Sequence, residues 1–330
     1  MIIRRIVFIL LALLLLIPCQ GVSRNPVPKG VQTSIYQNGQ LIRIYDRSVT
    51  EPIRIFVISD THLFRSDERE EPYKQYSKRM SKAYNTTRHF LSGEPTNPEE
   101  SLLQTLSLAR EKNADAIAIV GDLVSYPSEA GVEWAKAALD SCGIPWFYTT
   151  GNHDWHYEGT EGSETALREE WTQKRLLPLY QGFNHECYSV IIKGVKLIFV
   201  DNATYQILPS QMKAFSAEIK GKEPKLLFGH IPYYAPGYSI TTVGHPDWGY
   251  DTDRGYRAER RERWPAEGPS DTTIDFWQAI LKATRRNHLM ASFSGHHHVQ
   301  QTAIVDSWNQ FTVTANCKGG YFEVIVEPMP

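Results

Sequence analysis

Short apolar runs that stop abruptly at polar residues recur along this chain. The clearest ones cover residues 53–58, 116–120, 146–148, 196–200, 226–228 and 290–293. Runs of this length that contain β-branched or aromatic residues, bounded by turn residues, are typical of buried strands. Residues 190–192 and the run after Gly194 predict a hairpin, and residues 302–305, 311–314 and 322–326 predict the last three strands.

Helical patterns alternate with these strands. Pro98 opens a stretch with apolar residues spaced for one helix face, and Ser128 is placed to cap a second helix that runs to residue 139. Ser163 is placed to cap a third to residue 174, and Asp271 is placed to cap a fourth to residue 286. Strands alternating with helices predict an α/β architecture, and the hairpin indicates that its sheets are mixed.

Two long segments, residues 63–97 and 231–270, interrupt this alternation. Such loops beside strand ends are commonly lids or binding loops. In the second segment, Tyr233, Tyr234 and Trp248 could stack on a ligand, or they could only pack the loop. Five arginines there could clamp phosphates or simply face solvent: Arg254, Arg257, Arg260, Arg261 and Arg263. Because no linker divides the chain, we expect residues 22–330 to form a single domain with these two insertions.

The first residues resemble an export signal. Arg4 and Arg5 precede an apolar run over residues 6–17, which is too short to span a bilayer comfortably. Residues 1–21 therefore predict a signal peptide cleaved after Gly21. Two alternatives are a lipoprotein signal that ends before Cys19, with Cys19 acylated, and a retained anchor helix. We expect an exported protein, periplasmic or extracellular, whose only membrane contact is a lipid anchor at Cys19 if one forms.

Composition limits the classes of binding partner and metal ligand that the chain is expected to use. The 330 residues include 35 Lys or Arg against 37 Asp or Glu, a net charge of −2, so no global basic field favours nucleic acid. Apart from Cys19, the cysteines are Cys142, Cys187 and Cys317, and none forms a CxxC pair. They are expected to be small buried hydrophobes rather than metal ligands. The oligomeric state stays open.

Polar side chains gather where five of the predicted strands end. The motifs are Asp60-x-His62, Gly121-Asp122, Gly151-Asn152-His153-Asp154, Gly229-His230 and Gly295-His296-x-His298. Imidazole and carboxylate are ligands for Mn, Fe or Zn, and glycines permit the tight turns that convergence requires. Residues i and i+2 of an extended segment can reach one centre. The pattern predicts a metal centre at one edge of the sheets.

In this order, the five motifs resemble those of the calcineurin-like metallophosphoesterase superfamily across residues 60–298. The resemblance implies a sandwich of two mixed β-sheets flanked by helices. It also implies a phosphoesterase that hydrolyses a small-molecule phosphate monoester or diester with hydroxide formed from water at two metal ions (Mn, Fe or Zn). The implied ligands are Asp60, His62 and His298 for the first ion and Asn152, His230 and His296 for the second, with Asp122 bridging both.

The resemblance also assigns roles beside the metals. His153 would hydrogen-bond the phosphate and stabilise or protonate the leaving oxygen, and Asp154 would orient or polarise His153. His297 would face away. His156 and His245 are further candidates for contacts near the metals or the substrate.

Two departures separate the chain from known branches of the superfamily. Purple acid phosphatases carry a metal-binding tyrosine at the position of Ser125, and Tyr126 comes one residue too late. Ser/Thr protein phosphatases carry Asp-Arg-Gly shortly after Gly-Asp, which this chain lacks. The remainder resembles the broad bacterial branch of cyclic-nucleotide phosphodiesterases and assorted phosphatases. Alternatives are a nuclease of this fold, a catalytically inactive binding scaffold and a metal-dependent amide or lactone hydrolase.

Overall fold

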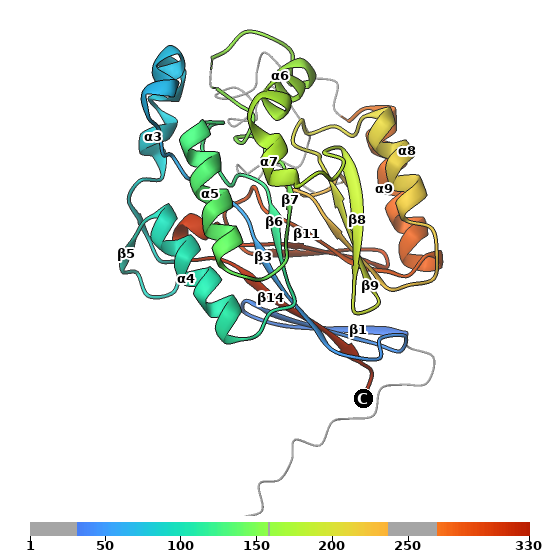
Figure 1. The fold of residues 1–330 in the computed structure, drawn as a ribbon. Coiled ribbons are helices and arrows are strands. Elements are labelled where there is room, and N and C mark those ends of the chain that lie inside the picture. Colours follow the sequence, from blue (N-terminus) through green and yellow to red (C-terminus); the bar gives the residue numbers. More distant parts are fainter. Residues whose placement is uncertain (1–31, 158, 237–268) are drawn as a thin grey trace, which may run out of the picture. The chain divides into compact units, whose positions relative to one another are not determined.

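The computed structural model describes residues 32–157, 159–236 and 269–330 (Figure 1). The described residues between Thr33 and Met329 group into one compact unit. The predicted signal at residues 1–21 lies outside the described residues, as do Trp248, His245 and the five arginines of the second insertion. Among the helices that are described, none is both long enough and apolar enough to cross a bilayer.

The first sheet has six strands and mixed direction. Its order is β1 (Thr33–Asn38), β2 (Leu41–Asp46), β14 (Phe322–Pro328), β3 (Ile53–Ile58), β6 (Ala116–Val120) and β7 (Trp146–Thr149). Strands β3, β6 and β7 run parallel, whereas β14 is antiparallel to β3 and β1 is antiparallel to β2. The three parallel strands therefore end at the same edge.

The second sheet has the same strand number and is also mixed. Its order is β12 (Gln301–Val305), β13 (Trp308–Thr312), β11 (Leu289–Ser294), β10 (Lys225–Phe228), β9 (Val195–Val200) and β8 (Cys187–Ile192). Strands β9, β10, β11 and β13 run parallel, and both edge strands are antiparallel to their neighbours. The predicted pair of mixed sheets and the hairpin at Gly194 are confirmed.

Helices cover the sheets (Figure 1). Helices α4 (Pro98–Glu111) and α5 (Glu129–Ser141) flank the first sheet, and α8 (Pro209–Glu218) and α9 (Asp271–Arg286) pack on the second. Ser128 caps α5 as predicted, and Ser163 caps α6 (Glu164–Trp171). The cap of α9 is Ser270 rather than the predicted Asp271, which is the first residue of the helix.

Two hydrophobic cores hold these layers together. The larger one contains aromatic rings from both sheets, such as Phe322 of the first and Phe293 of the second, whose ring centroids lie 6.5 Å apart. The smaller core lies between the second sheet and helices α8 and α9 and includes Phe276. Tyr233 belongs to this smaller core, is 2% exposed and packs against Phe276. Tyr233 is therefore a packing residue and cannot stack on a substrate.

Two local predictions had wrong bounds, and two further elements were missed. The helix expected to end at residue 174 continues through a π-helical turn, η2 (Thr172–Leu176), into α7 (Leu177–Tyr180). The irregular turn lies just before Pro178, which lacks the N–H that a regular helix needs there. Strand β13 begins at Trp308 rather than residue 311, since a tight turn at Asp306 pairs Val305 with Trp308. The hairpin of β1 and β2 and helix α8 were not predicted.

The first insertion, residues 63–97, contains regular elements. They are the 3-10 helix η1 (Glu68–Tyr73), helices α2 (Lys74–Ser77) and α3 (Met80–Ala83), and the small hairpin of β4 (Thr87–Arg88) and β5 (Pro95–Thr96). Buried Glu70 accepts hydrogen bonds from the Tyr157 hydroxyl and from the Glu129 N–H, and the Phe90 N–H donates to the Lys318 carbonyl over 2.9 Å. These contacts fix the insertion against the rest of the unit.

Candidate metal centre

The predicted motifs follow the carboxyl ends of parallel strands in both sheets. Asp60, Asp122 and Asn152 follow β3, β6 and β7, and His230 and His296 follow β10 and β11. Backbone hydrogen bonds join the turns within each sheet. The Asp60 N–H donates to the Gly121 carbonyl over 3.0 Å, and the Gly295 N–H donates to the His230 carbonyl over 2.8 Å. The His296 N–H of the second sheet also donates to Asp60 Oδ2 of the first over 2.9 Å, so the strand ends of the two sheets meet at one polar edge.

The side chains at this edge form two clusters that could each hold a metal ion. The first contains Asp60, His62 and His298, and the second contains Asp122, His230 and His296. In the first cluster, His298 Nε2 lies 3.2 Å from Asp60 Oδ1 and 3.1 Å from His62 Nε2. In both clusters the candidate ligand atoms lie within 4.8 Å of one another. Sequence reasoning had grouped these same residues.

Asp122 lies between the clusters. Its Oδ2 atom is 3.2 Å from His230 Nε2 in the second cluster and 3.8 Å from His62 Nε2 in the first. Its Oδ1 accepts a hydrogen bond from the His153 N–H over 2.8 Å. Among the described residues, the buried Oδ2 has no hydrogen-bond partner. An unsatisfied buried carboxylate oxygen is costly, so imidazoles and carboxylates arranged in this way suit a pair of bound cations.

His230 is oriented for ligation by its other ring nitrogen. Nδ1 donates to the Val120 carbonyl over 2.9 Å, which leaves the lone pair of Nε2 directed into the cluster. That Nε2 atom is also 3.2 Å from the side-chain oxygen of Asn152. The structure therefore brings the amide of Asn152 to the second cluster, where the resemblance expects it.

Five of the candidate ligands have left-handed backbone conformations. The φ angles are 54° at Asp60, 55° at His62, 50° at Asp122, 68° at His296 and 58° at His298. Such angles are uncommon outside glycine, cost about 1–3 kcal/mol each and concentrate at functional sites. They turn each side chain sharply off the end of its strand, and this brings residues from different strands to one place.

Charge and burial perturb the titration of these groups. Burial lowers the pKa of His62 well below its usual value, so its imidazole is neutral and able to ligate. Burial opposes ionisation of Asp122 and Asp60, but the neighbouring histidines outweigh it and lower both pKa values. Burial also disfavours the charged form of His230, yet the carboxylate of Asp122 raises its pKa to about 9, so a cation bound at Nε2 would take the place of a proton there. The site therefore retains negative carboxylates in a buried environment.

His153 and Asp154 take different places beside the clusters. The His153 ring lies edge-on to His62, with ring centroids 5.2 Å apart, and the residue is 8% exposed. Asp154 is fully buried and accepts hydrogen bonds from the Val124 N–H (2.9 Å) and the Gly151 N–H (2.8 Å). The Tyr148 hydroxyl also donates to it over 2.8 Å. Through these bonds Asp154 braces the turn that carries His153.

Burial, together with the charge of Asp122, raises the pKa of Asp154 to about 7.

The histidines outside the clusters take separate positions. His297 pairs with Gln301 over 2.7 Å, and its ring lies 6.0 Å from that of His296; the ring of His156 lies 6.5 Å from that of His153.

Sequence reasoning missed Tyr84, which comes from the first insertion. Its ring stacks on His62 with centroids 4.0 Å apart and an interplanar angle of 18°, and it lies 5.3 Å from the ring of His298. Nothing in the local sequence distinguishes Tyr84 from the other tyrosines of this segment. By contrast, the Ser125 hydroxyl donates to the His62 carbonyl and the Tyr126 hydroxyl donates to the Phe64 carbonyl, each over 2.9 Å. Both hydroxyls therefore serve the backbone.

A family model of the calcineurin-like phosphoesterases matches residues 53–300, the part of the chain that carries all five motifs. The chain belongs to this family. It is accordingly a metal-dependent phosphoric ester hydrolase, as the motifs predicted. No protein with a curated description matches the chain significantly.

Solved structures of similar fold include a dimetal phosphatase from Danio rerio, with 12% identity and a TM-score of 0.47 over 82% of this chain and 89% of that one. The purple acid phosphatase PPD1 from yellow lupin has 10% identity and a TM-score of 0.49, over 86% of this chain and 47% of that one. Phosphopantetheinyl hydrolase from Mycobacterium tuberculosis has 10% identity and a TM-score of 0.37, over 81% and 92%.

Proposed function

We propose that the protein is a dinuclear enzyme that hydrolyses a phosphate monoester or diester of a small molecule. The observation that carries this proposal is the position of Asp122, whose unpartnered buried oxygen faces histidines of both clusters within the described part of the chain. A carboxylate in that position can serve two cations at once. Two ions held here would acidify a water molecule and neutralise charge on the phosphate, and the absence of thiolates from the clusters favours Mn, Fe or Zn.

The residues in and around the clusters have separate roles in binding the ions, donating a proton and holding the backbone. Asp60, His62 and His298 would hold the first ion, and His230, His296 and Asn152 the second, with Asp122 shared between them. The ring of His153 lies beside that of His62 in the first cluster, so its imidazole can reach a phosphate bound there and donate a proton to the leaving oxygen. Asp154 supports His153 by holding the backbone of the same turn.

The test is turnover with matched chromogenic phosphate monoester and diester substrates. Protein expressed from its full sequence would be stripped with chelator and supplied with Mn, Fe or Zn, and bound metal would be counted in parallel. We expect two ions per chain and cleavage that depends on them. Two bound ions without cleavage of either substrate would favour the inactive binding scaffold, whereas no bound ion would refute the ligand assignment. Cleavage of polynucleotides alone would favour the nuclease.

We also propose that the protein is exported. The support is the basic start and short apolar run of residues 1–21, which suit a signal peptide or a lipoprotein signal that ends before Cys19. Fractionation of expressing cells and the mass of the mature N-terminus test this proposal. A protein that stays in the cytoplasm with Met1 intact would contradict it.

A further inference from the structure

Asn202 is bonded to the backbone of a candidate metal ligand. It follows β9 and is 4% exposed. Its side-chain oxygen accepts hydrogen bonds from the N–H groups of His230 and Ile231, each over 3.0 Å. Its side-chain nitrogen donates to the Ile231 carbonyl over 2.6 Å. A single buried amide thus satisfies three backbone groups of the turn that presents His230.

These bonds constrain the imidazole of His230 from its main-chain side. The ring itself is held by the bond between Nδ1 and the Val120 carbonyl. With the backbone fixed by Asn202 and one ring nitrogen fixed by Val120, Nε2 has little freedom to leave the second cluster. Partners that orient a metal ligand in this way typically change metal affinity by about 10–100-fold when they are removed.

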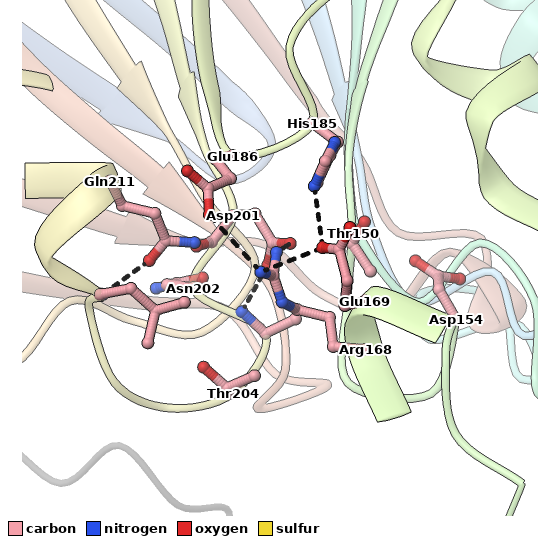
Figure 2. Close-up of polar contacts among 12 residues, drawn as sticks. Thr150, Asp154, Arg168, Glu169, His185, Glu186, Asp201, Asn202, Thr204 and Gln211 are labelled. Carbon is pink, nitrogen blue, oxygen red and sulfur yellow. Dashed lines mark hydrogen bonds and ion pairs between the residues drawn. The ribbon is translucent and has the colours of Figure 1, made fainter. Parts of the chain in front are cut away.

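Asn202 is itself held by a buried ion pair on the preceding residue. Arg168 of α6 is 2% exposed, and its Nη1 donates to Asp201 Oδ2 over 2.6 Å. The Asp201 N–H donates to the Glu186 carbonyl over 3.1 Å, and the Asp201 carbonyl accepts from the Gln211 side chain over 2.6 Å. Figure 2 shows Arg168 in the middle of these groups, next to the turn that carries Asn202. The turn after β9 is therefore fixed from helix α6, from the residue before β8 and from α8.

We propose that Asn202 is a positioning residue for the metal ligand His230, and that the Arg168–Asp201 pair holds Asn202 in place. The proposal rests on the proposed assignment of His230 as a ligand of the second ion. It predicts that the loss of Asn202 weakens one metal site selectively, because the side-chain contacts of Asn202 within the described part of the chain reach His230 and Ile231 and none of the residues of the first cluster.

Gln310 provides a matched control. It is fully buried, its side-chain oxygen accepts the Tyr233 N–H over 2.6 Å, and its nitrogen donates to the Tyr233 carbonyl over 3.2 Å. Gln310 therefore clamps the same segment shortly after His230 without touching the ligand. Removing it costs similar buried hydrogen bonds but leaves the backbone of His230 held by Asn202.

The experiment is a chelator-competition titration of Zn or Mn into full-length protein, with unfolding followed separately on stripped protein. For Asn202→Ala we expect one ion to bind about 10–100-fold more weakly and the other within about twofold of the parent. Gln310→Ala should lose comparable stability and keep both affinities. Asn202→Asp keeps the oxygen for both N–H groups and loses only the donor, so we expect a smaller loss at the same ion, and this variant carries the test if the alanine variant does not fold.

Unchanged affinities in Asn202→Asp and Asn202→Ala would overturn the positioning role. Equal losses in Gln310→Ala and Asn202→Ala would also overturn it, because they would show a general loosening of the segment. The ligand assignment is tested separately by His230→Ala. If that variant binds two ions as tightly as the parent, the assignment of His230 fails, whatever the Asn202 variants do.

Discussion

Replacing Gly121 by alanine should damage the metal centre, although Gly121 is not itself a candidate ligand. Gly121 has a φ angle of 81°, and a Cβ atom there would lie 2.6 Å from Cγ and Nδ1 of His230 and 2.7 Å from Cα of Gly151. A left-handed conformation costs alanine about 1–2 kcal/mol. Relief of the overlap costs about 1–3 kcal/mol more, since both neighbours are buried and fixed. The movement falls on the ring nitrogen that binds the Val120 carbonyl.

Gly143→Ala separates the two costs. Gly143 has a similar φ angle of 72°, but its added Cβ would meet nothing within 4 Å. In stripped protein, denaturant unfolding should show a loss of about 1–2 kcal/mol for Gly143→Ala and about 2–5 kcal/mol for Gly121→Ala. Titration should show metal affinity at least about tenfold weaker for Gly121→Ala alone, which corresponds to about 1.4 kcal/mol. If the two variants lose the same stability and bind metal equally well, close packing against His230 is not what the glycine provides.

Three further predictions concern single side chains. His153→Ala should keep two bound ions and lower kcat by about 10²–10⁴-fold on a chromogenic substrate, and loss of the ions instead would make His153 a ligand. Tyr84→Ala should weaken one ion by about 2–10-fold in a metal titration, because a ring stacked on His62 contributes about 0.5–1.5 kcal/mol, whereas Tyr84→Phe should bind like the parent. His288→Asn should destabilise the protein by about 1–3 kcal/mol near pH 5.5 and by less near pH 9, as measured by denaturant unfolding, and an equal loss at both pH values would contradict this.

The sign of the pH effect follows from the Asp46–His288 pair. His288 Nε2 lies 2.7 Å from Asp46 Oδ2, and this hydrogen bond raises the pKa of His288 above its usual 6.5. Burial opposes ionisation of Asp46, yet its bonds to His288, Ser48 and Thr33 lower its pKa. The histidine contribution is complete below about pH 6.5 and disappears as the pH rises through the folded pKa. The aspartate contribution is complete above about pH 4 and disappears on further acidification.

Sequence reasoning succeeded where local pattern and chemistry coincide. Strands β3, β6, β9, β10 and β11 are buried on both faces, so they appear in the sequence as continuous apolar runs, and each is followed by polar residues. Parallel direction then brings those polar residues to one edge, which is why the grouping of Asp60, His62 and Asp122 could be predicted. In the hairpin at the sheet edge, β2 alternates between buried and partly exposed residues and β1 has no buried residue, so the apolar pattern is weaker.

The contacts that sequence reasoning missed depend on residues far apart in the chain. Tyr84 is one of several tyrosines in a polar segment. Its ring stacks on His62 in a folded insertion that the hydrogen bonds of Glu70 and Phe90 hold against the rest of the unit. Asn202 lies 28 residues before His230, and the pairing of β9 with β10 brings the two together. Neither the contact of Tyr84 with His62 nor that of Asn202 with His230 is indicated by any spacing or composition within a single sequence.

Each candidate metal cluster draws on both sheets. Asp60 and His62 extend from the first sheet and His298 from the second, and Asp122 likewise faces His230 and His296 across the sandwich. An ion in either cluster would act as a cross-link between the two layers. The described cysteines, Cys142, Cys187 and Cys317, are unpaired, so no disulfide among them supplies such a tie. Ions that bind only the folded chain shift the folding equilibrium towards it. The lifetime of this protein in the presence of proteases should therefore depend on metal supply as well as on its own sequence.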